Sequence, residues 1–462
     1  MFGHYFCIKE ECRYGELLKL IDEKKYFEIR RTLQDMNVVD VAEFFEEMAD
    51  DPRMVIVFRL LPKDMSAEVF SYLDHDLQRK IVEGISDREL AIILDDLFMD
   101  DTVDFIEEMP AYIVKRVLKM ADNETRKQIN QMLMYPEDSA GSIMTIEFME
   151  LDGDWSVRRA IDEVRRQSAD KESISTLFVT DGKRKLEGVI SLRDVLIGKD
   201  SQRIDELMER DVISVNTHAD QEQCVDLFKK YDLVSMPVVD NENRLVGLIT
   251  IDDVMDVMEE ETTEDIYKMA AMEPVEDSYI SSGVFTLARK RVVWLIILML
   301  SATVTGEIIN QYQAALATNV LLVSFIPMLM DTGGNCGSQS STLVIRGLAL
   351  EEIKFKDIFK VMFKEFRIAL VVGVALAIVN GIRIYIMYRN QFTFSTVLLS
   401  FTIGFTLMLI VILSELIGCI LPMVAQKLKL DPAIMASPLI TTIVDTFSVF
   451  VFFKVAMLLL PM

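Results

Sequence analysis

Cysteine and histidine are scarce in this chain, which removes the side chains that build disulfide frameworks and soft metal sites. The 462 residues include five cysteines whose spacing fits no disulfide scaffold, so free thiols of a cytosol-facing protein are expected. None of the three histidines lies in an apolar stretch of membrane length. A metal site would therefore be built from oxygen ligands, which favours a hard divalent cation over Zn²⁺ or Cu⁺.

Basic side chains are under-represented in the first 280 residues. Residues 1–280 hold 64 Asp and Glu against 34 Lys and Arg, a net charge of −30, whereas residues 281–462 hold 9 against 14, a net charge of +5. Because phosphate binding needs a basic face, this balance argues against a nucleic-acid partner. We expect an acidic soluble part, suited to binding divalent cations, followed by a membrane part.

The first 137 residues show apolar positions at helical spacing and no alternating pattern typical of strands. The run DVAEFFEEM, which starts at Asp40, is echoed by DTVDFIEEM, which starts at Asp101. We therefore expect an all-α superhelix over residues 1–137, in which each unit buries its apolar face on its neighbours. The acidic residues of this region, Asp101 among them, are interpreted by default as a solvated face.

An internal repeat with an offset of 59 residues begins after Gly141. GVISLRD at 188–194 corresponds to GLITIDD at 247–253, and each copy has two alternating strands about a turn rich in Asp, Asn or Gly. The pattern resembles a tandem pair of CBS domains, an α+β fold that we place at residues 138–256. The fold serves regulation in many contexts and does not by itself name a function.

CBS pairs often bind adenine nucleotides. The segment SLRD resembles the part of such sites that contacts ribose and phosphate, which makes Ser191, Arg193 and Asp194 candidate ATP-binding residues. Alternatively, Ser191 or Asp194 caps the helix that follows the strand.

A helix leaves the second repeat and forms a connecting region at residues 257–282. Acidic side chains crowd one of its faces, and such a face is either a solvated linker or is neutralised by a divalent cation or a basic partner. Pro274 ends the helix.

Residues 283–462 are apolar enough to form a transmembrane domain. Basic residues gather in the loops between spans two and three and between spans four and five, so the N-terminal domains are expected in the cytoplasm and the C-terminus outside. The chain is thus predicted to be a multi-pass protein of the cell (inner) membrane. Five spans are predicted, at 292–311, 317–345, 368–387, 395–425 and 433–460.

Two of these spans carry polar side chains at membrane depth. Asp445 lies near the middle of the last span, where an aspartate costs roughly 2.5–3.5 kcal/mol and usually faces a bundle interior or a water-filled path. The second span contains LMDTGGNCGSQSSTL at 329–343, which either lines water or allows tight helix packing. Glu307 and Glu415 are weaker candidates.

Several motifs together resemble the MgtE family of magnesium channels over nearly the whole chain. They are YPEDSAGSIMT (135–145), the CBS repeat, TEDIYKM (263–269), MDTGGNCGSQSSTLVIRGLA (330–349) and LDPAIMASPLITTIVD (430–445). The resemblance implies a homodimer with an ion path between the second and fifth spans. Asp445 then binds hydrated Mg²⁺, and Ser437 and Thr441 line the path beside it.

The resemblance also implies cytosolic sites that sense Mg²⁺. By local match these fall on Glu68, Asp100, Asp220, Glu222, Asp232, Asp253, Asp256, Glu261, Glu264 and Asp265.

The sequence thus predicts a Mg²⁺-selective channel for magnesium uptake, with Mg²⁺ as both cargo and regulator, that closes when cytosolic Mg²⁺ binds the acidic region. No enzymatic activity and no catalytic residue are expected. A secondary transporter that couples Mg²⁺ to H⁺ or Na⁺ is one alternative, and current reversal potentials discriminate it. A membrane-anchored CBS nucleotide sensor is another, which would bind ATP without ion flux.

Overall fold

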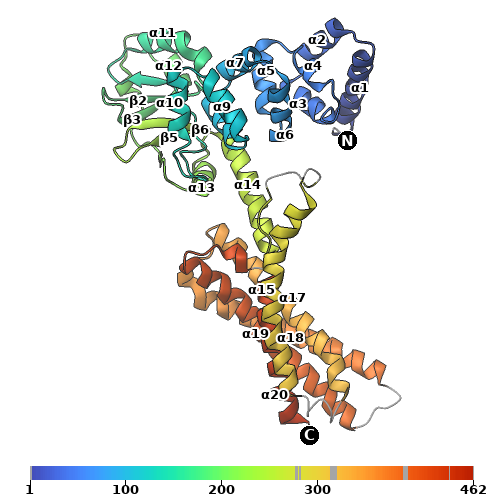
Figure 1. Cartoon of the computed structure of the whole chain (residues 1–462). Coiled ribbons are helices and arrows are strands. Elements are labelled where there is room, and N and C mark those ends of the chain that lie inside the picture. The colour runs from blue at the N-terminus through green and yellow to red at the C-terminus, as the bar shows by residue number, and fades with distance from the viewer. Residues whose placement is uncertain are drawn as a thin grey trace. The chain divides into compact units, whose positions relative to one another are not determined.

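The computed structural model describes residues 3–275, 279, 282–312, 320–388, 394–435 and 437–460, with side chains from Arg13 onward except those of residues 64, 320 and 394–396. The chain forms two compact units, Met1–Met258 and Glu259–Met462, which share the long helix α14 (Ile251–Met269) (Figure 1).

The first half of the first unit is helical, as predicted. Helix α3 packs against α5, α5 against α7 and α7 against α9, which is the arrangement of a superhelix whose units bury their apolar faces on one another. A chain of aromatic contacts from Phe45 through Phe58 and Phe70 to Phe105 forms its core. The helices are α1 (Gly3–Asp22), α2 (Tyr26–Gln34), α3 (Val38–Glu47), α4 (Met54–Phe58), α5 (Lys63–Ser71), α6 (His75–Gly84), α7 (Asp87–Asp96), α8 (Met99–Glu107), α9 (Ala111–Met120) and α10 (Asn123–Met132).

The second half of this unit contains the two predicted α+β repeats. Each has a three-stranded sheet in which the first pair of strands is parallel and the second antiparallel. Val179 pairs with Gly188 and Val238 with Gly247, positions that match at the predicted offset, and a register shift follows each pair. The elements are β1 (Glu150–Asp152), α11 (Val157–Gln167), η1 (Ser168–Asp170), β2 (Thr176–Thr180), β3 (Leu186–Ser191), α12 (Leu192–Ile197), η2 (Ile204–Glu206), β4 (Val215–Asn216), α13 (Gln221–Tyr231), β5 (Ser235–Val239) and β6 (Leu245–Thr250).

Both repeats need a glycine where another segment crosses the hairpin. A Cβ at Gly188 would lie 2.6 Å from Met208 Sδ, and a Cβ at Gly247 would overlap Met144 Sδ. In each copy a methionine side chain packs directly against the glycine of the hairpin, so the two copies share the same packing contact.

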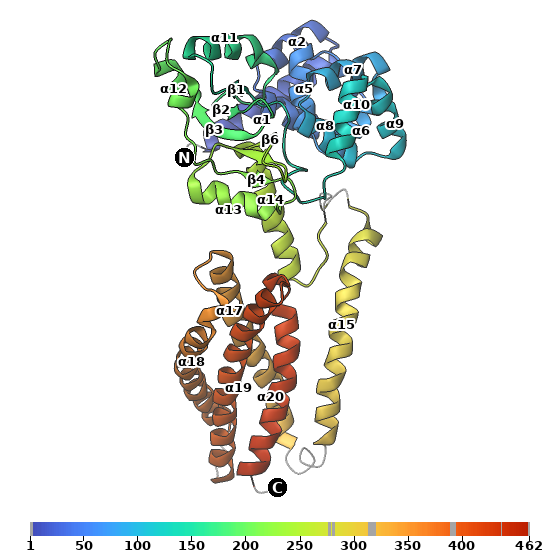
Figure 2. The same ribbon diagram turned by 90° about the vertical axis from the view of Figure 1, so that its left-hand side faces the viewer.

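The second unit is a bundle of long apolar helices (Figure 2). Helix α19 packs against α17, α18 and α20, and α15 packs against α20. Its elements are α15 (Val284–Gln311), η3 (Val320–Phe325), α17 (Ile326–Ala349), η4 (Phe355–Asp357), α18 (Ile358–Met387), α19 (Phe394–Lys427), η6 (Pro432–Met435) and α20 (Ser437–Leu459).

Four of the described helical stretches are long and apolar enough to cross a membrane: Val284–Gln311, Phe355–Met387, Val397–Lys427 and Pro432–Leu459. The second predicted span differs from these. Its helix, α17, has 24 residues and starts at Ile326, whereas the predicted span starts at 317. Because of its polar segment, α17 is not among the four helical stretches apolar enough to cross a membrane. Helix α17 packs against α19 and α20, where Ser340 and Ser341 are buried, whereas Asp331, Asn335 and Gln339 of the same helix are exposed. Five spans remain our proposal.

Candidate cation sites

Helices α17 and α20 approach closely because α17 carries glycine at the contact. A Cβ at Gly334 would lie 2.8 Å from Thr441 Cγ2, and a Cβ at Gly333 would lie 2.8 Å from Ser448 Oγ. Small residues at such positions let helix backbones pack together in a membrane. The polar segment of α17 therefore lies against the N-terminal half of α20.

Oxygen donors form one row on each of these two helices. Ser437, Thr441 and Asp445 are spaced by four residues on α20, so they share a face. Ser437 Oγ lies 3.1 Å from Ser338 Oγ of α17, and Thr441 Oγ1 donates to the Ser437 carbonyl oxygen at 2.7 Å. Both serine and threonine oxygens keep lone pairs for another donor or a cation.

Asp445 is half-buried, and the polar contacts of its carboxylate are incomplete. Its Oδ1 atom is inaccessible to solvent and has no hydrogen-bond partner among the described residues. The charge that acts on it is that of Asp331, an exposed residue of α17. A buried carboxylate oxygen beside a second acid, with hydroxyl oxygens on the same face, is an arrangement that a hydrated divalent cation would complete.

A second acidic cluster lies in the first unit, at the start of α8 and of α14. Asp100 is 8% exposed, and its Oδ1 accepts the Asp101 backbone N–H at 2.9 Å. Burial and then the charge of Asp253 hold the pKa of Asp100 well above its usual range and raise that of Asp101 to about 6. Burial likewise raises the pKa of Asp253 to about 6, although hydrogen bonds from Thr250 oppose the shift.

Glu172 joins this cluster from the loop before β2. Burial and then the charge of Asp253 raise its pKa to about 7, and its Oε2 atom has no hydrogen-bond partner among the described residues. Glu147, Asp252 and Asp256 act on the same carboxyls. No ion pair with a basic residue is found for Asp100, Asp101 or Asp253 in the described part of the chain, so the cluster is short of positive charge.

The structure therefore brings together Asp100, Asp253 and Asp256, and adds Asp101, Glu147, Asp252 and Glu172. The interpretation of Asp101 as part of a solvated face is wrong, because α8 turns it toward α14. Within the described residues no group of three or more His, Cys, Asp or Glu side chains is arranged to hold a metal ion, so the carboxylates would have to converge on one.

Three predicted sensor residues lie on α13. Asp220 caps the helix by accepting the Glu222 backbone N–H at 2.9 Å, and Glu222 is in the first turn. Asp232 ends the helix in the left-handed conformation, with φ of 51°. All three are exposed, as is Glu68 on α5, and none of the four is among the charges that act on the acidic cluster.

The last predicted sensor residues lie in the second unit, on the C-terminal part of α14. Lys268 pairs with Glu264 and with Asp431, each at 2.8 Å. Partial burial and the charge of Asp431 raise the pKa of Asp265. Glu261, also on α14, is half-buried. Lys268 thus supplies positive charge to the acidic residues at this end of α14. Asp431, which the sequence analysis did not predict as a site residue, lies beside them.

The predicted nucleotide segment is engaged in local hydrogen bonds. Ser191 caps α12: its Oγ accepts the Asp194 backbone N–H at 3.1 Å and donates to Asp194 Oδ2 at 2.6 Å. The capping alternative is therefore present in this structure. Arg193 is exposed on the first turn of α12.

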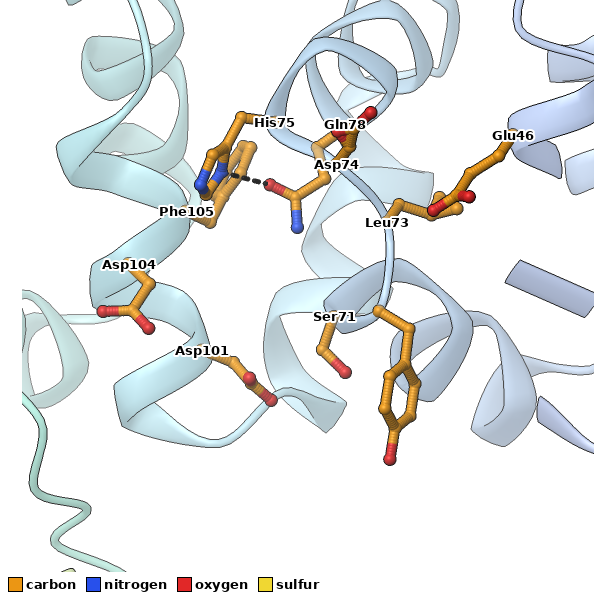
Figure 3. A pocket seen from close by; sticks show the side chains of 10 residues that line it. Glu46, Ser71, Leu73, Asp74, His75, Gln78, Asp101, Asp104 and Phe105 are labelled. Carbon is orange, nitrogen blue, oxygen red and sulfur yellow. Dashed lines mark hydrogen bonds between the residues drawn. The ribbon is translucent and has the colours of Figure 1, made fainter. Parts of the chain in front are cut away.

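A cleft of about 340 Å³ in the helical domain adds acidic groups that the sequence analysis did not predict as a site. Figure 3 shows Asp101 and Asp104 of α8 on one side of it and Asp74 and Glu46 on the other. Burial and then the charge of Asp74 raise the pKa of Glu46. Glu46 is on α3, Asp74 precedes α6, and Asp101 and Asp104 are on α8, so no spacing in the sequence could have grouped the two sides of the cleft.

Comparison with known proteins assigns a family model to each part of the chain. A model of divalent cation transporters, MgtE, matches residues 326–455, and a model of the MgtE intracellular N domain matches residues 36–138. A CBS domain model matches residues 140–198 and 204–260.

Two curated relatives match over nearly their whole length. The magnesium transporter MgtE of Thermus thermophilus is 35% identical over 94% of this chain and 95% of its own, and that of Bacillus subtilis is 31% identical over 96% and 97%. Among solved structures, the cytosolic domain of the Mg²⁺ channel MgtE in complex with ATP is 33% identical and covers 53% of this chain and 99% of its own, with a TM-score of 0.51. The soluble part of a magnesium transporter is 26% identical, covers 55% of this chain and 99% of its own, and has a TM-score of 0.51.

Proposed function

This chain belongs to the MgtE family of divalent cation transporters, which are not enzymes, and from that premise we propose that it is a Mg²⁺-selective channel for magnesium uptake. The observation that carries the proposal is the incompletely paired carboxylate of Asp445, held at membrane depth beside the oxygen donors of α17 and α20. Keeping a carboxylate in an apolar segment costs free energy unless an ion binds to it.

We place the ion path between α17 and α20 at the two-fold axis of a homodimer. Mg²⁺ gives up its water reluctantly and is usually held through one or two carboxylates with several waters retained. One Asp445 from each chain would supply that charge, while Ser437 and Thr441 would hydrogen-bond the retained waters. In a closed dimer the same face of each subunit meets its copy, which brings the two carboxylates together.

The test is Mg²⁺ uptake into liposomes that contain the purified full chain. Asp445→Asn should lower uptake at least tenfold, because the amide keeps the size of the side chain but loses its charge. Thr446→Val is the matched control, since Thr446 contacts Thr305 of α15 at 2.8 Å instead of the proposed path. Mg²⁺ flux at the wild-type level in Asp445→Asn would contradict the placement of the ion path between α17 and α20.

We further propose that cytosolic Mg²⁺ closes the channel by binding the acidic cluster. The seven carboxyls of the acidic cluster repel one another, and within the described residues Asp100, Asp101 and Asp253 have no ion pair with a basic side chain. A ligand that binds only when these carboxyls converge stabilises the converged state. Glu68, Asp220, Glu222, Asp232, Glu261, Glu264 and Asp265 would bind further ions as the soluble domains of the dimer come together.

ATP is proposed as a regulatory ligand at Ser191, Arg193 and Asp194, since the cytosolic domain of a 33% identical relative was crystallised with ATP. The hydroxyl of Ser191 would exchange its bond to Asp194 for one to the ribose. Calorimetric titration of the full chain with ATP checks this: Asp194→Ala should weaken binding, and an unchanged affinity would place ATP elsewhere.

We propose that the chain lies in the cell membrane with residues 1–282 in the cytoplasm and the C-terminus outside. An odd number of spans and the basic loops support that orientation. A C-terminal tag should be cut by protease added to intact spheroplasts; a protected tag would contradict it. A pure Mg²⁺ Nernst response of the reversal potential separates a channel from transport coupled to H⁺ or Na⁺.

A further inference from the structure

A second cluster of polar side chains is buried in the membrane bundle, where α17 packs against α19. It consists of Ser340 on α17, Glu365 on α18 and Glu415 on α19, whose side chains are 3%, 6% and 5% exposed. Two glutamates buried to this extent in a bundle of apolar helices are costly unless their charge is compensated.

The compensation does not come from a basic side chain. Within the described residues neither Glu365 nor Glu415 forms an ion pair, and the charge that acts on Glu415 is that of Glu365. The other titratable groups that face the pair are the thiols of Cys336 on α17 and Cys419 on α19, which are neutral donors. A proton bound to one of the two carboxyls would remove its negative charge without a basic side chain.

The hydrogen bonds around Ser340 indicate which carboxyl binds this proton. Ser340 Oγ lies 2.8 Å from Glu365 Oε2 and 3.0 Å from the backbone carbonyl oxygen of Glu415. A serine hydroxyl has one proton to donate, so it cannot donate to both oxygens. Both contacts become hydrogen bonds only if Glu365 carries a proton and donates it to Ser340, which then donates to the Glu415 carbonyl.

The carboxyl of Glu415 is the second half of the group. Its Oε2 atom is inaccessible to solvent and has no hydrogen-bond partner among the described residues. Buried polar atoms of native proteins are nearly always paired, so an orphaned carboxyl oxygen beside a second carboxyl indicates a place for a further proton.

We propose that Glu365 and Glu415 form a buried proton-binding site, in which Glu365 donates a proton to Ser340 and the unpaired Glu415 carboxyl oxygen is the place for a second proton. The site is separate from the face of α17 that carries Asp331 and Ser338, so it does not depend on the proposed Mg²⁺ path. Protons that bind here act on the packing of α17, α18 and α19 instead of on the ion in the path.

Infrared spectroscopy of the full chain in lipid nanodiscs tests the site. The difference between the wild-type and Glu365→Gln spectra at neutral pH should contain the C=O stretch of a protonated carboxylic acid, because buried acids of the first unit, such as Asp100, contribute equally to both spectra and cancel. Ser340→Ala should shift that band without removing it, because the acid loses its acceptor. Glu307→Gln is the matched control, since Glu307 is an exposed glutamate of α15, and it should leave the band unchanged.

The Glu365→Gln variant is expected to fold, because the amide can donate to Ser340 as the acid does; its elution and unfolding temperature are measured alongside the spectra. Glu415→Gln should remove a second component that appears on acidification. The proposal is overturned if the difference between the wild-type and Glu365→Gln spectra contains no acid band. A carboxylate band that shifts with Na⁺ or Mg²⁺, and does so only when Glu365 is present, would mean that a metal ion occupies the site.

Discussion

At the scale of single residues, this chain repeatedly buries carboxyls without a basic partner. Asp100 is almost inaccessible, and oxygens of Glu172 and Asp445 lack hydrogen-bond partners among the described residues. Natural proteins usually pair such groups, because the desolvation of a charge is expensive. Unpaired acids at several places therefore indicate sites completed by cations, here Mg²⁺ or protons.

The acidic cluster of the first unit predicts how stability depends on pH. Its folded-state pKa values are raised, to about 6 for Asp101 and Asp253 and about 7 for Glu172, mainly by burial. The folded form thus binds these protons more tightly than the unfolded one. The stability they contribute is fully present below the unfolded-state pKa values of about 4, and it is lost as pH rises from there through the folded-state values of about 6 to about 7.

Hydrogen exchange of the full chain measures this effect. Without divalent cations, the amides of α8 and the first turn of α14 should lose protection across that pH window, and saturating Mg²⁺ should remove the dependence. Asp253→Asn should stabilise the Mg²⁺-free form by roughly 1–3 kcal/mol, the interaction of like charges at an effective dielectric of about 20. Asp226→Asn, an exposed change on α13, is the control. Amide protection that rises with pH would contradict the predicted loss of stability at higher pH.

At the scale of elements, α17 is shaped by close contacts with two neighbours. Its Gly333 and Gly334 admit α20, and Gly337 lies against α19, where a Cβ at Gly418 would overlap the Gly337 carbonyl oxygen. Backbone cannot move aside as a flexible side chain can. The glycines of the polar segment therefore set how near the donor-bearing helices lie.

Gly418→Ala should consequently destabilise the bundle by about 1–3 kcal/mol, the usual cost of overpacking, and lower its unfolding temperature in detergent. Gly404→Ala is the matched control on the same helix, because its Cβ would make an ordinary contact, 3.6 Å from Ala377 Cβ. Equal unfolding temperatures for the two variants would show that α17 and α19 are less tightly packed than described.

Elements with a period or a repeat could be predicted from the sequence, whereas sites assembled from separate segments could not. The offset of the CBS repeat predicted paired hairpins, and helical spacing predicted the superhelix. Glu147 and Glu172 come from loops with no pattern of their own, and α8 turns Asp101 inward through tertiary packing that periodicity does not reveal. The predicted second span starts nine residues before α17, because the residues of η3 are as apolar as a span.

At the scale of the whole molecule, charge is divided between an acidic first part and a slightly basic membrane part. Helix α14 is the element common to the two units, and it carries acidic groups at both ends: Asp253 and Asp256 in the first unit, Glu264 and Asp265 in the second. Mg²⁺ bound to these groups, as we propose, would change the charge along one continuous helix. This helix is the physical route by which we propose that cytosolic Mg²⁺ controls the channel.

Mg²⁺ currents in excised membrane patches, recorded while Mg²⁺ on the cytosolic side is varied, test this account most directly. Wild type should conduct when cytosolic Mg²⁺ is absent and close as it rises to millimolar levels. The double variant Asp100→Asn and Asp253→Asn should conduct Mg²⁺ but need at least tenfold more cytosolic Mg²⁺ to close. Wild-type current that is insensitive to cytosolic Mg²⁺, or full sensitivity in the double variant, would contradict the account.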